Sequence, residues 1–287
     1  MDPRTIELLS PAKDCATGIA AIDHGADAVY IGAPRFGARA AAGNCIAEIR
    51  QLTEYAHQFH ARVYVALNTL LNDEELQEAV TISWQLSEIG IDALIIQDMG
   101  LLECDLPPLP LHASTQCDNR TKEKVKFLED VGFTQVVLAR ELSLAQIAQV
   151  RAATSVPLEF FIHGALCVSY SGRCFMSETV AGRSANRGEC AQFCRHRYTL
   201  KEGSGNIIRK DKHLLSLKDL DLSCHLQELI DAGISSFKIE GRLKDAGYVK
   251  NVTCSFNFSE GTCLFMGCSG KVVNWGCSST GRAIQWH

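Results

Sequence analysis

Residues 24–32, HGADAVYIG, show in one short stretch the plan on which the chain is built. A helical pattern ends, a glycine caps it, and an apolar run of strand type begins about three positions later. The same plan returns at residues 89–97 (IGIDALIIQ), 131–139 (VGFTQVVLA) and 232–240 (AGISSFKIE). This weak repeat predicts helices that alternate with buried strands.

Eight apolar, β-rich runs along the chain fit strands that are buried on both faces, as parallel sheets require. They are Ile6–Leu9, Ala28–Gly32, Arg62–Asn68, Ala93–Asp98, Leu111–Thr115, Gln135–Arg140, Leu158–Gly164 and Ser236–Gly241. Helical patterns at 72–89, 121–131, 143–153 and 220–232 lie between them. Asn72 with Glu75, and Ser143 with Gln146, predict capping boxes.

Eight strands with helical crossovers over about 250 residues predict a TIM-like (β/α)8 barrel of parallel strands. An open doubly wound sheet has the same local pattern and is the alternative. The chain lacks a Gly-x-Gly-x-x-Gly turn after its first strand, which weakens a dinucleotide-binding version of that sheet. We therefore expect residues 1–253 to form one barrel.

Composition excludes several classes of protein. The chain has 287 residues, of which 46% are hydrophobic and 21% charged, so it is globular rather than disordered. Its net charge of −5 argues against a protein that coats nucleic acid, so any such contact must be a local patch. No run is long enough to span a membrane and no signal peptide is visible. We expect a cytoplasmic protein, in which thirteen cysteines are not a disulfide framework.

Polar residues follow several predicted strands at the end where barrels carry their chemistry. The catalytic candidates are His112, Gln116, His163 and Glu240. Each one taken alone is better explained as a residue that caps a strand or bonds to backbone. Together they predict a polar mouth.

A long Cys- and Arg-rich segment, residues 167–211, lies between the last two predicted strands. Cys167, Cys174, Cys190 and Cys194 are separated by six, fifteen and three residues. Four thiolates in one loop suit Zn²⁺ or an iron–sulfur cluster, although the spacing is neither that of a zinc ribbon nor that of a bacterial ferredoxin. The alternative is that these cysteines are small buried side chains.

The runs EFFIHGALC (159–167) and GRCFMS (172–177) resemble the signature of the peptidase U32 family. The resemblance covers about residues 6–253 and includes LHASTQ (111–116), GRSANRG (182–188) and FKIEGR (237–242). It is strongest for the rRNA-hydroxylating branch. It implies a TIM-like barrel and a [4Fe–4S] cluster held by Cys167, Cys174, Cys190 and Cys194. It also implies hydroxylation of a 23S rRNA cytidine to 5-hydroxycytidine, with prephenate or a derivative as co-substrate.

Structured RNA is accordingly the expected partner, and the phosphate contacts are expected from Arg183, Arg187, Arg195 and Arg197. The alternative for these arginines is a solvated loop or pairing with nearby carboxylates. The family's name points to a second function, a collagenase-like peptidase. The chain has neither a His-Glu-x-x-His helix nor a Gly-x-Ser-x-Gly elbow, and a Cys167–His163 pair loses its nucleophile if Cys167 binds a metal. A third function is a non-catalytic iron–sulfur partner of another protein.

Residues 254–287 depart from the family pattern. Only Glu260, Lys271 and Arg282 are charged there, and four cysteines follow no helical or strand period, at Cys254, Cys263, Cys268 and Cys277. The cysteine spacing suits no common zinc module. We expect a non-native or disordered segment, produced by a frameshift and early stop, and therefore a truncated copy of the protein.

Overall fold

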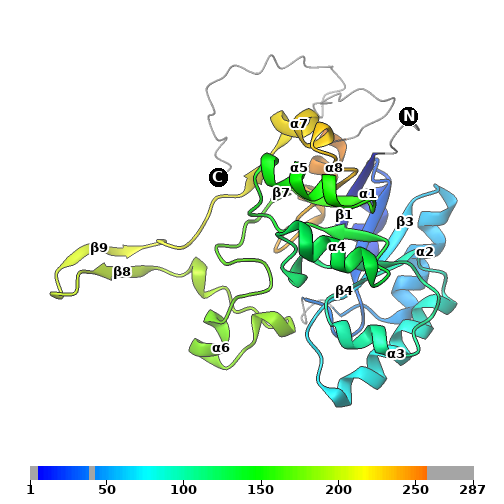
Figure 1. The fold of residues 1–287 in the computed structure, drawn as a ribbon, viewed down its shortest axis with the longest axis horizontal. Coiled ribbons are helices and arrows are strands. Elements are labelled where there is room, and N and C mark those ends of the chain that lie inside the picture. Colours follow the sequence, from blue (N-terminus) through cyan, green and yellow to red (C-terminus); the bar gives the residue numbers. More distant parts are fainter. Residues whose placement is uncertain (1–5, 39–42, 257–287) are drawn as a thin grey trace.

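The computed structural model describes residues 6–38 and 43–256, which form a closed barrel of eight parallel strands (Figure 1). Each strand pairs with the next in chain order, and β7 pairs with both β6 and β11, while β11 returns to β1. The strands are β1 (Glu7–Ala12), β2 (Ala28–Gly32), β3 (Arg62–Leu67), β4 (Ala93–Ile96), β5 (Leu111–Ala113), β6 (Gln135–Val137), β7 (Leu158–Gly164) and β11 (Ser236–Ile239). This closure confirms the predicted barrel and excludes the open sheet.

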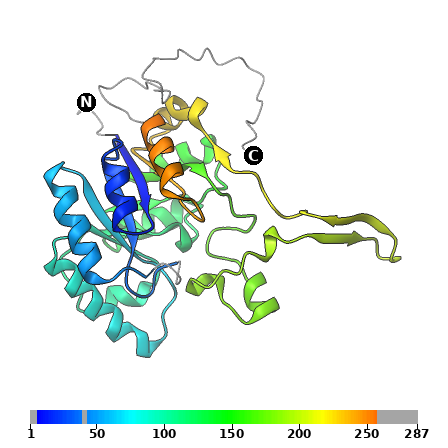
Figure 2. The same ribbon diagram turned by 180° about the vertical axis from the view of Figure 1, so that it is seen from behind.

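Helices cover the outside of the barrel (Figure 1, Figure 2). Asn72 and Ser143 each accept a hydrogen bond from the backbone three residues later, so both predicted capping boxes are confirmed. Gly90 and Gly132 end their helices with φ values of +79° and +103°, which only glycine adopts readily. The helices are α1 (Cys15–Ile22), α2 (Ile46–Gln58), α3 (Asp73–Glu88), α4 (Lys122–Asp130), α5 (Leu144–Ala153), α7 (Leu226–Asp231) and α8 (Ala246–Ser255).

Alternate residues of each strand face opposite sides, so the barrel has an outer core under the helices and an inner core of its own. Val29 and Ile31 belong to the outer core, whereas Ala28 packs with Tyr64 and Ile95 in the inner one. The inner side also carries polar pairs that satisfy each other. Lys238 Nζ lies 2.6 Å from Glu159 Oε1, and Tyr64 donates to Glu7 across 2.6 Å. The barrel interior is therefore packed rather than open.

The stretch 220–232 is not the single helix that its pattern predicts. Leu220–Asp221 forms β10, which runs antiparallel to β7 and pairs with His163 and Gly164. Helix α7 begins only at Leu226. The pairing is a long-range contact that periodicity within the stretch cannot reveal.

The Cys- and Arg-rich segment is more structured than a plain loop. It contains α6 (Met176–Ala181), short 3₁₀ turns and an antiparallel hairpin of β8 (Tyr198–Lys201) and β9 (Ile207–Lys212). The hairpin projects well away from the barrel (Figure 1, Figure 2). Among the described residues, no helix has the length and apolar character needed to cross a membrane.

The predicted boundary at residue 253 falls inside α8, which continues to Ser255. Phe256 is buried next to it. Residues 257–287 lie outside the described residues, so the expectation of a non-native tail over 254–287 stays a prediction.

Candidate active site at the barrel mouth

Two predicted mouth residues, His163 and Glu240, stand at the carboxyl ends of neighbouring strands β7 and β11. Glu240 is buried and forms a 2.9 Å ion pair with Arg140, which follows β6. The Arg140 guanidinium also lies 4.3 Å from the centre of the Phe161 ring. Arg140 thus fixes the position of the Glu240 side chain, an arrangement that suits positioning more than proton transfer.

His163 is half-buried and contacts Tyr248 of α8, whose hydroxyl lies 2.7 Å from Nδ1. Burial lowers the pKa of His163, while the carboxylates of Asp221 and Asp219 oppose that shift. Burial raises the pKa of Tyr248, so the phenol stays protonated. The two side chains therefore form a hydrogen bond at the mouth. Sequence reasoning missed Tyr248, although it lies in a stretch that matches the family, because spacing cannot place α8 against β7.

His112 lies deeper than predicted, within the barrel interior. Its ring packs edge-on against Tyr64, with the ring centroids 4.6 Å apart. Burial, with the positive charges of Lys238 and Arg62, lowers the pKa of His112 to about 3. Its Nδ1 is buried and has no hydrogen-bond partner among the described residues. A neutral imidazole at this depth is part of the inner core rather than a base at the mouth.

Gln116 lies at the mouth and supports the cysteine segment through its backbone. Its carbonyl oxygen accepts a hydrogen bond of 3.2 Å from Gln97 Nε2. Gly172, with φ of +71°, packs so closely that a Cβ there would lie 2.0 Å from that same oxygen. The segment that follows β7 is therefore folded back over the turn after β5.

The four predicted cysteines lie in the stretch that begins directly after β7. Burial raises the pKa of Cys194, the positive charge of Arg195 opposes that rise, and the charges of Cys167, Cys190 and Cys174 add to it. At Cys190 burial is outweighed by hydrogen bonds from Arg242 and from the backbone of Gln192, so its pKa is lowered. A lowered thiol pKa favours the thiolate, the form that binds metals.

This donor set has the right chemistry for an iron–sulfur cluster or Zn²⁺. The four thiols do not converge on one point. Among the described residues, no three His, Cys, Asp or Glu side chains are placed as ligands of one metal ion. Binding a cluster requires the four side chains to turn toward a common centre. Cys167 is exposed and the other three are half-buried, so they lie at the surface of the segment rather than in the core.

Three of the four predicted RNA-binding arginines have hydrogen-bond or ion-pair partners within the fold. Arg187 pairs with Glu75 at 2.7 Å and donates to the Leu70 carbonyl. Arg195 donates to the carbonyls of Leu166 and Leu217 and to Ser216, so it ties the two ends of the segment together. Arg197 pairs with Asp211 at 2.9 Å. The partner is a carboxylate for Arg187 and Arg197, and backbone carbonyls with Ser216 for Arg195. Arg183 is exposed and has no partner among the described residues.

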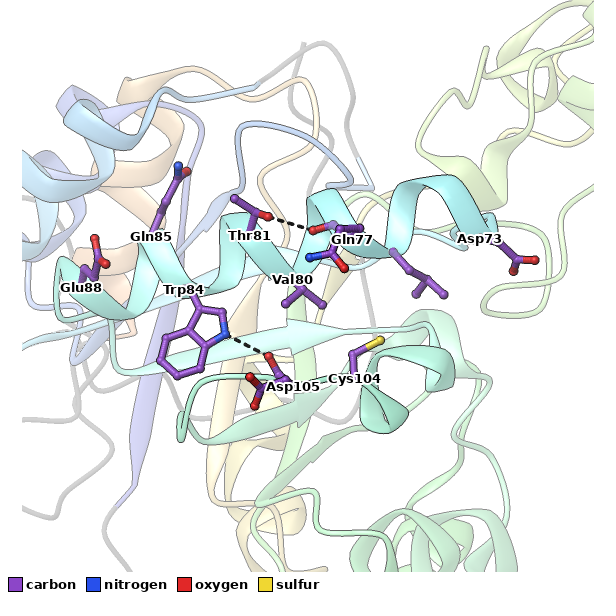
Figure 3. Close-up of a pocket in the computed structure, with 10 residues that line it drawn as sticks. Asp73, Gln77, Val80, Thr81, Trp84, Gln85, Glu88, Cys104 and Asp105 are labelled. Atoms are coloured by element: carbon purple, nitrogen blue, oxygen red, sulfur yellow. Dashed lines mark hydrogen bonds between the residues drawn. The ribbon is translucent and has the colours of Figure 1, made fainter.

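A groove with a volume of about 610 Å³ lies elsewhere, on the outer flank of α3 (Figure 3). Between β4 and β5 the chain forms only a 3₁₀ turn, Met99–Glu103, so no α-helix fills this flank. Trp84 spans the groove and donates to the Asp105 carbonyl across 2.9 Å. The groove runs along the outer side of a helix and includes none of the mouth residues, so it is not the candidate active site.

The chain is similar in sequence to known proteins. The model of peptidase family U32 matches residues 13–259. The 23S rRNA 5-hydroxycytidine C2501 synthase of Escherichia coli (strain K12) is 58% identical over 251 residues, which are 88% of this chain and 38% of that protein. The tRNA hydroxylation protein P1 of Bacillus subtilis (strain 168) is 36% identical over 256 residues, 86% of this chain and 61% of that protein. The chain therefore spans less than two thirds of either relative.

The fold itself has a counterpart among solved structures. The structure of a U32 peptidase matches with a TM-score of 0.53 and 13% identity. The match covers 83% of this chain and 94% of that one. At this identity the likeness supports the barrel fold alone.

Proposed function

Because the chain belongs to the peptidase U32 family, we propose that it hydroxylates a base of structured RNA at the barrel mouth, and that the base is a cytidine of 23S rRNA. The observation that carries the proposal is the 58% identity to an rRNA hydroxycytidine synthase, over a stretch that includes the mouth and all four cysteines. The chain covers 38% of that relative, so substrate and partners belong to the proposal.

Cys167, Cys174, Cys190 and Cys194 are the residues that would hold a [4Fe–4S] cluster. Such a cluster supplies electron-transfer chemistry, which suits a reaction that replaces a ring C–H by C–OH. Prephenate or a derivative remains the proposed co-substrate, on the resemblance alone. Arg242 supports this role, because its side chain lowers the pKa of the Cys190 thiol and so favours the thiolate.

The other mouth residues position the site and move protons. The hydrogen bond of 2.7 Å between His163 and Tyr248 gives the mouth a pair of side chains able to accept or deliver a proton. Arg140 holds Glu240 in place. A cytosine reaches this depth only when it is splayed out of its stack, and the exposed rings of Tyr170 and Phe175 offer it surfaces for stacking.

The peptidase alternative has less support from the geometry. A cysteine nucleophile needs a base within hydrogen-bond reach. Within the described part of the chain, no hydrogen bond joins the Cys167 thiol to His163, whose Nδ1 is engaged by Tyr248. The role of a non-catalytic iron–sulfur partner is separated from catalysis by the following experiment.

The test is to express the chain in an E. coli strain that lacks its own 23S rRNA 5-hydroxycytidine synthase. Nucleosides from the rRNA are then analysed by mass spectrometry. We expect a cytidine heavier by one oxygen atom with the chain, and none with a Cys174→Ser variant produced at the same level. Unmodified rRNA in cells that contain the folded chain, with modification restored by the E. coli enzyme in parallel, contradicts the proposal. Modification only after co-expression of a second protein favours the partner role.

A further inference from the structure

The hairpin of β8 and β9 is the most isolated part of the described chain; we call residues 197–212 the arm. Its strands pair only with each other among the described residues, and every residue of β9 is exposed. Figure 1 and Figure 2 show it extending away from the barrel on one side. A lone two-stranded hairpin is marginally stable in water, so an arm of this kind gains most from a surface on which to lie.

The arm is strongly basic on an acidic protein. It contains five cations and two carboxylates, whereas the whole chain has a net charge of −5. Asp211 pairs with Arg197, and Glu202 accepts hydrogen bonds from Ser204 and Asn206 in the turn. The three lysines of the arm have no carboxylate partner among the described residues. They are Lys201, Lys210 and Lys212.

Exposed apolar side chains lie in the same two strands as these cations. Leu200 is 45% exposed, Ile207 is 54% exposed and Ile208 is 43% exposed. Side chains of this kind, set between cations, can contact sugars and base faces while the cations meet phosphates. Six residues of β9 at about 3.4 Å each span about 20 Å, enough to follow several nucleotides.

Hydrogen bonds fix the base of the arm to residues that precede and follow it in the chain. Arg195 binds carbonyls on both sides of the arm, at Leu166 and at Leu217. His213, next to the end of β9, contacts the Arg195 carbonyl oxygen across 2.8 Å. Tyr198, which pairs with Lys212 at the base, donates to the Phe193 carbonyl. These contacts fix the base of the arm next to the turn that follows β7.

We propose that the arm is an RNA-binding element that lies along the phosphate backbone next to the target base. Lys201, Lys210 and Lys212 provide the phosphate contacts. This inference rests on the proposed function for its ligand, and it moves the main contact away from Arg187, Arg195 and Arg197, which have partners within the fold. Such contacts position the RNA without reading its sequence.

The test uses the cluster-loaded chain and a structured fragment of 23S rRNA. The variant carries Lys201→Ala, Lys210→Ala and Lys212→Ala. The matched control carries Lys122→Ala, Lys124→Ala and Lys126→Ala on α4, the same change of charge on the outside of the barrel. Affinity is measured across a salt series. We expect the arm variant to lower the slope of log Kd against log salt by about 0.7–0.9 for each phosphate that is no longer neutralised, or about two to three in total, and the control to leave it unchanged.

A second variant, Leu200→Ser with Ile207→Ser and Ile208→Ser, is expected to weaken RNA binding without changing the salt slope. An unchanged slope and affinity in the lysine variant overturns the inference, and so does a control that weakens binding as much. The inference and the proposed function can fail separately. If the chain hydroxylates RNA but its RNA affinity does not depend on the arm, only the inference is contradicted. If RNA binding depends on the arm but no hydroxylation occurs, only the proposed function is contradicted.

Discussion

The hydroxyl oxygen of Tyr248 lies 2.7 Å from Nδ1 of His163, although 85 positions separate the two residues. This contact fastens α8, the last described helix, to the strand that leads into the cysteine segment. Phe256 adds an edge-on contact to the same imidazole, with the ring centroids 5.8 Å apart. The end of α8 is therefore part of the support of the mouth.

Removing that hydroxyl with Tyr248→Phe should lower the free energy of unfolding by about 1 kcal/mol, because a partly buried hydrogen bond is removed while the ring packing remains. Urea denaturation measures the change. Tyr55→Phe is the control, since Tyr55 bonds to Asp23 at the surface. Equal losses in the two variants contradict the role given to the Tyr248 hydroxyl.

Gly164→Ala tests how tightly the mouth is packed. A Cβ at Gly164, where φ is +108°, would lie 2.5 Å from the Glu240 carbonyl oxygen and 2.9 Å from the Tyr248 hydroxyl. Gly132 has a φ of +103° but nothing within 4 Å of its Cβ position, so Gly132→Ala carries only the backbone strain. We expect a loss of about 1 kcal/mol for Gly132→Ala and about 2 kcal/mol more for Gly164→Ala. Both variants are measured by chemical unfolding. Equal losses of unfolding free energy contradict the tight packing, because the mouth then accommodates the added Cβ atom.

His112 predicts a pH dependence of stability. Its pKa is lowered to about 3 in the fold, chiefly by burial, against 6.5 for an exposed imidazole. Below pH 6.5 the imidazole of the unfolded chain binds a proton that the folded chain does not. The contribution of neutral His112 to stability is therefore complete above pH 6.5 and is lost as the pH falls toward 3. Chemical denaturation between pH 7 and pH 5 should show the wild type losing up to about 1.4 kcal/mol more per pH unit than His112→Phe. Parallel pH profiles contradict a buried neutral imidazole.

Alanine variants of Arg187 and Arg183 should distinguish an arginine that stabilises the fold from one that binds RNA. Arg187→Ala breaks the ion pair with Glu75 and is expected to lower stability by about 1 kcal/mol with little change in the salt dependence of RNA binding. Arg183 has no partner among the described residues, so Arg183→Ala should leave stability unchanged and reduce the salt slope by about one. Thermal unfolding and a binding titration over a salt series measure both effects. The reverse pattern overturns this assignment.

The sequence reveals the barrel because its signal is local and repeated. Each buried strand is a short apolar run, and glycines such as Gly90 and Gly132 mark where the preceding helix ends. Both capping boxes were visible for the same reason, since their partners are three residues apart. The strand order then follows from the closure of eight parallel strands.

Contacts between distant residues explain what the sequence could not reveal. Arg187 meets Glu75 over a separation of 112 positions, and β10 exists only because it pairs with β7. The arm was hidden inside a segment that reads as a polar loop, because its Gly- and Ser-containing turn and short strands bury almost nothing. The four-cysteine metal site stays a prediction, and the effect of Arg242 on the pKa of Cys190 lay outside the reach of spacing because the two residues are 52 positions apart.

The iron and acid-labile sulfide content of the chain purified without oxygen tests the cysteine site at the mouth most directly. We predict the content of one [4Fe–4S] cluster per chain, and its loss in each of the variants Cys167→Ala, Cys174→Ala, Cys190→Ala and Cys194→Ala. Cys104→Ala, which changes a cysteine in the groove beside α3, should keep the full content. Folded wild-type protein without iron, or full iron occupancy in all four variants, contradicts the assignment.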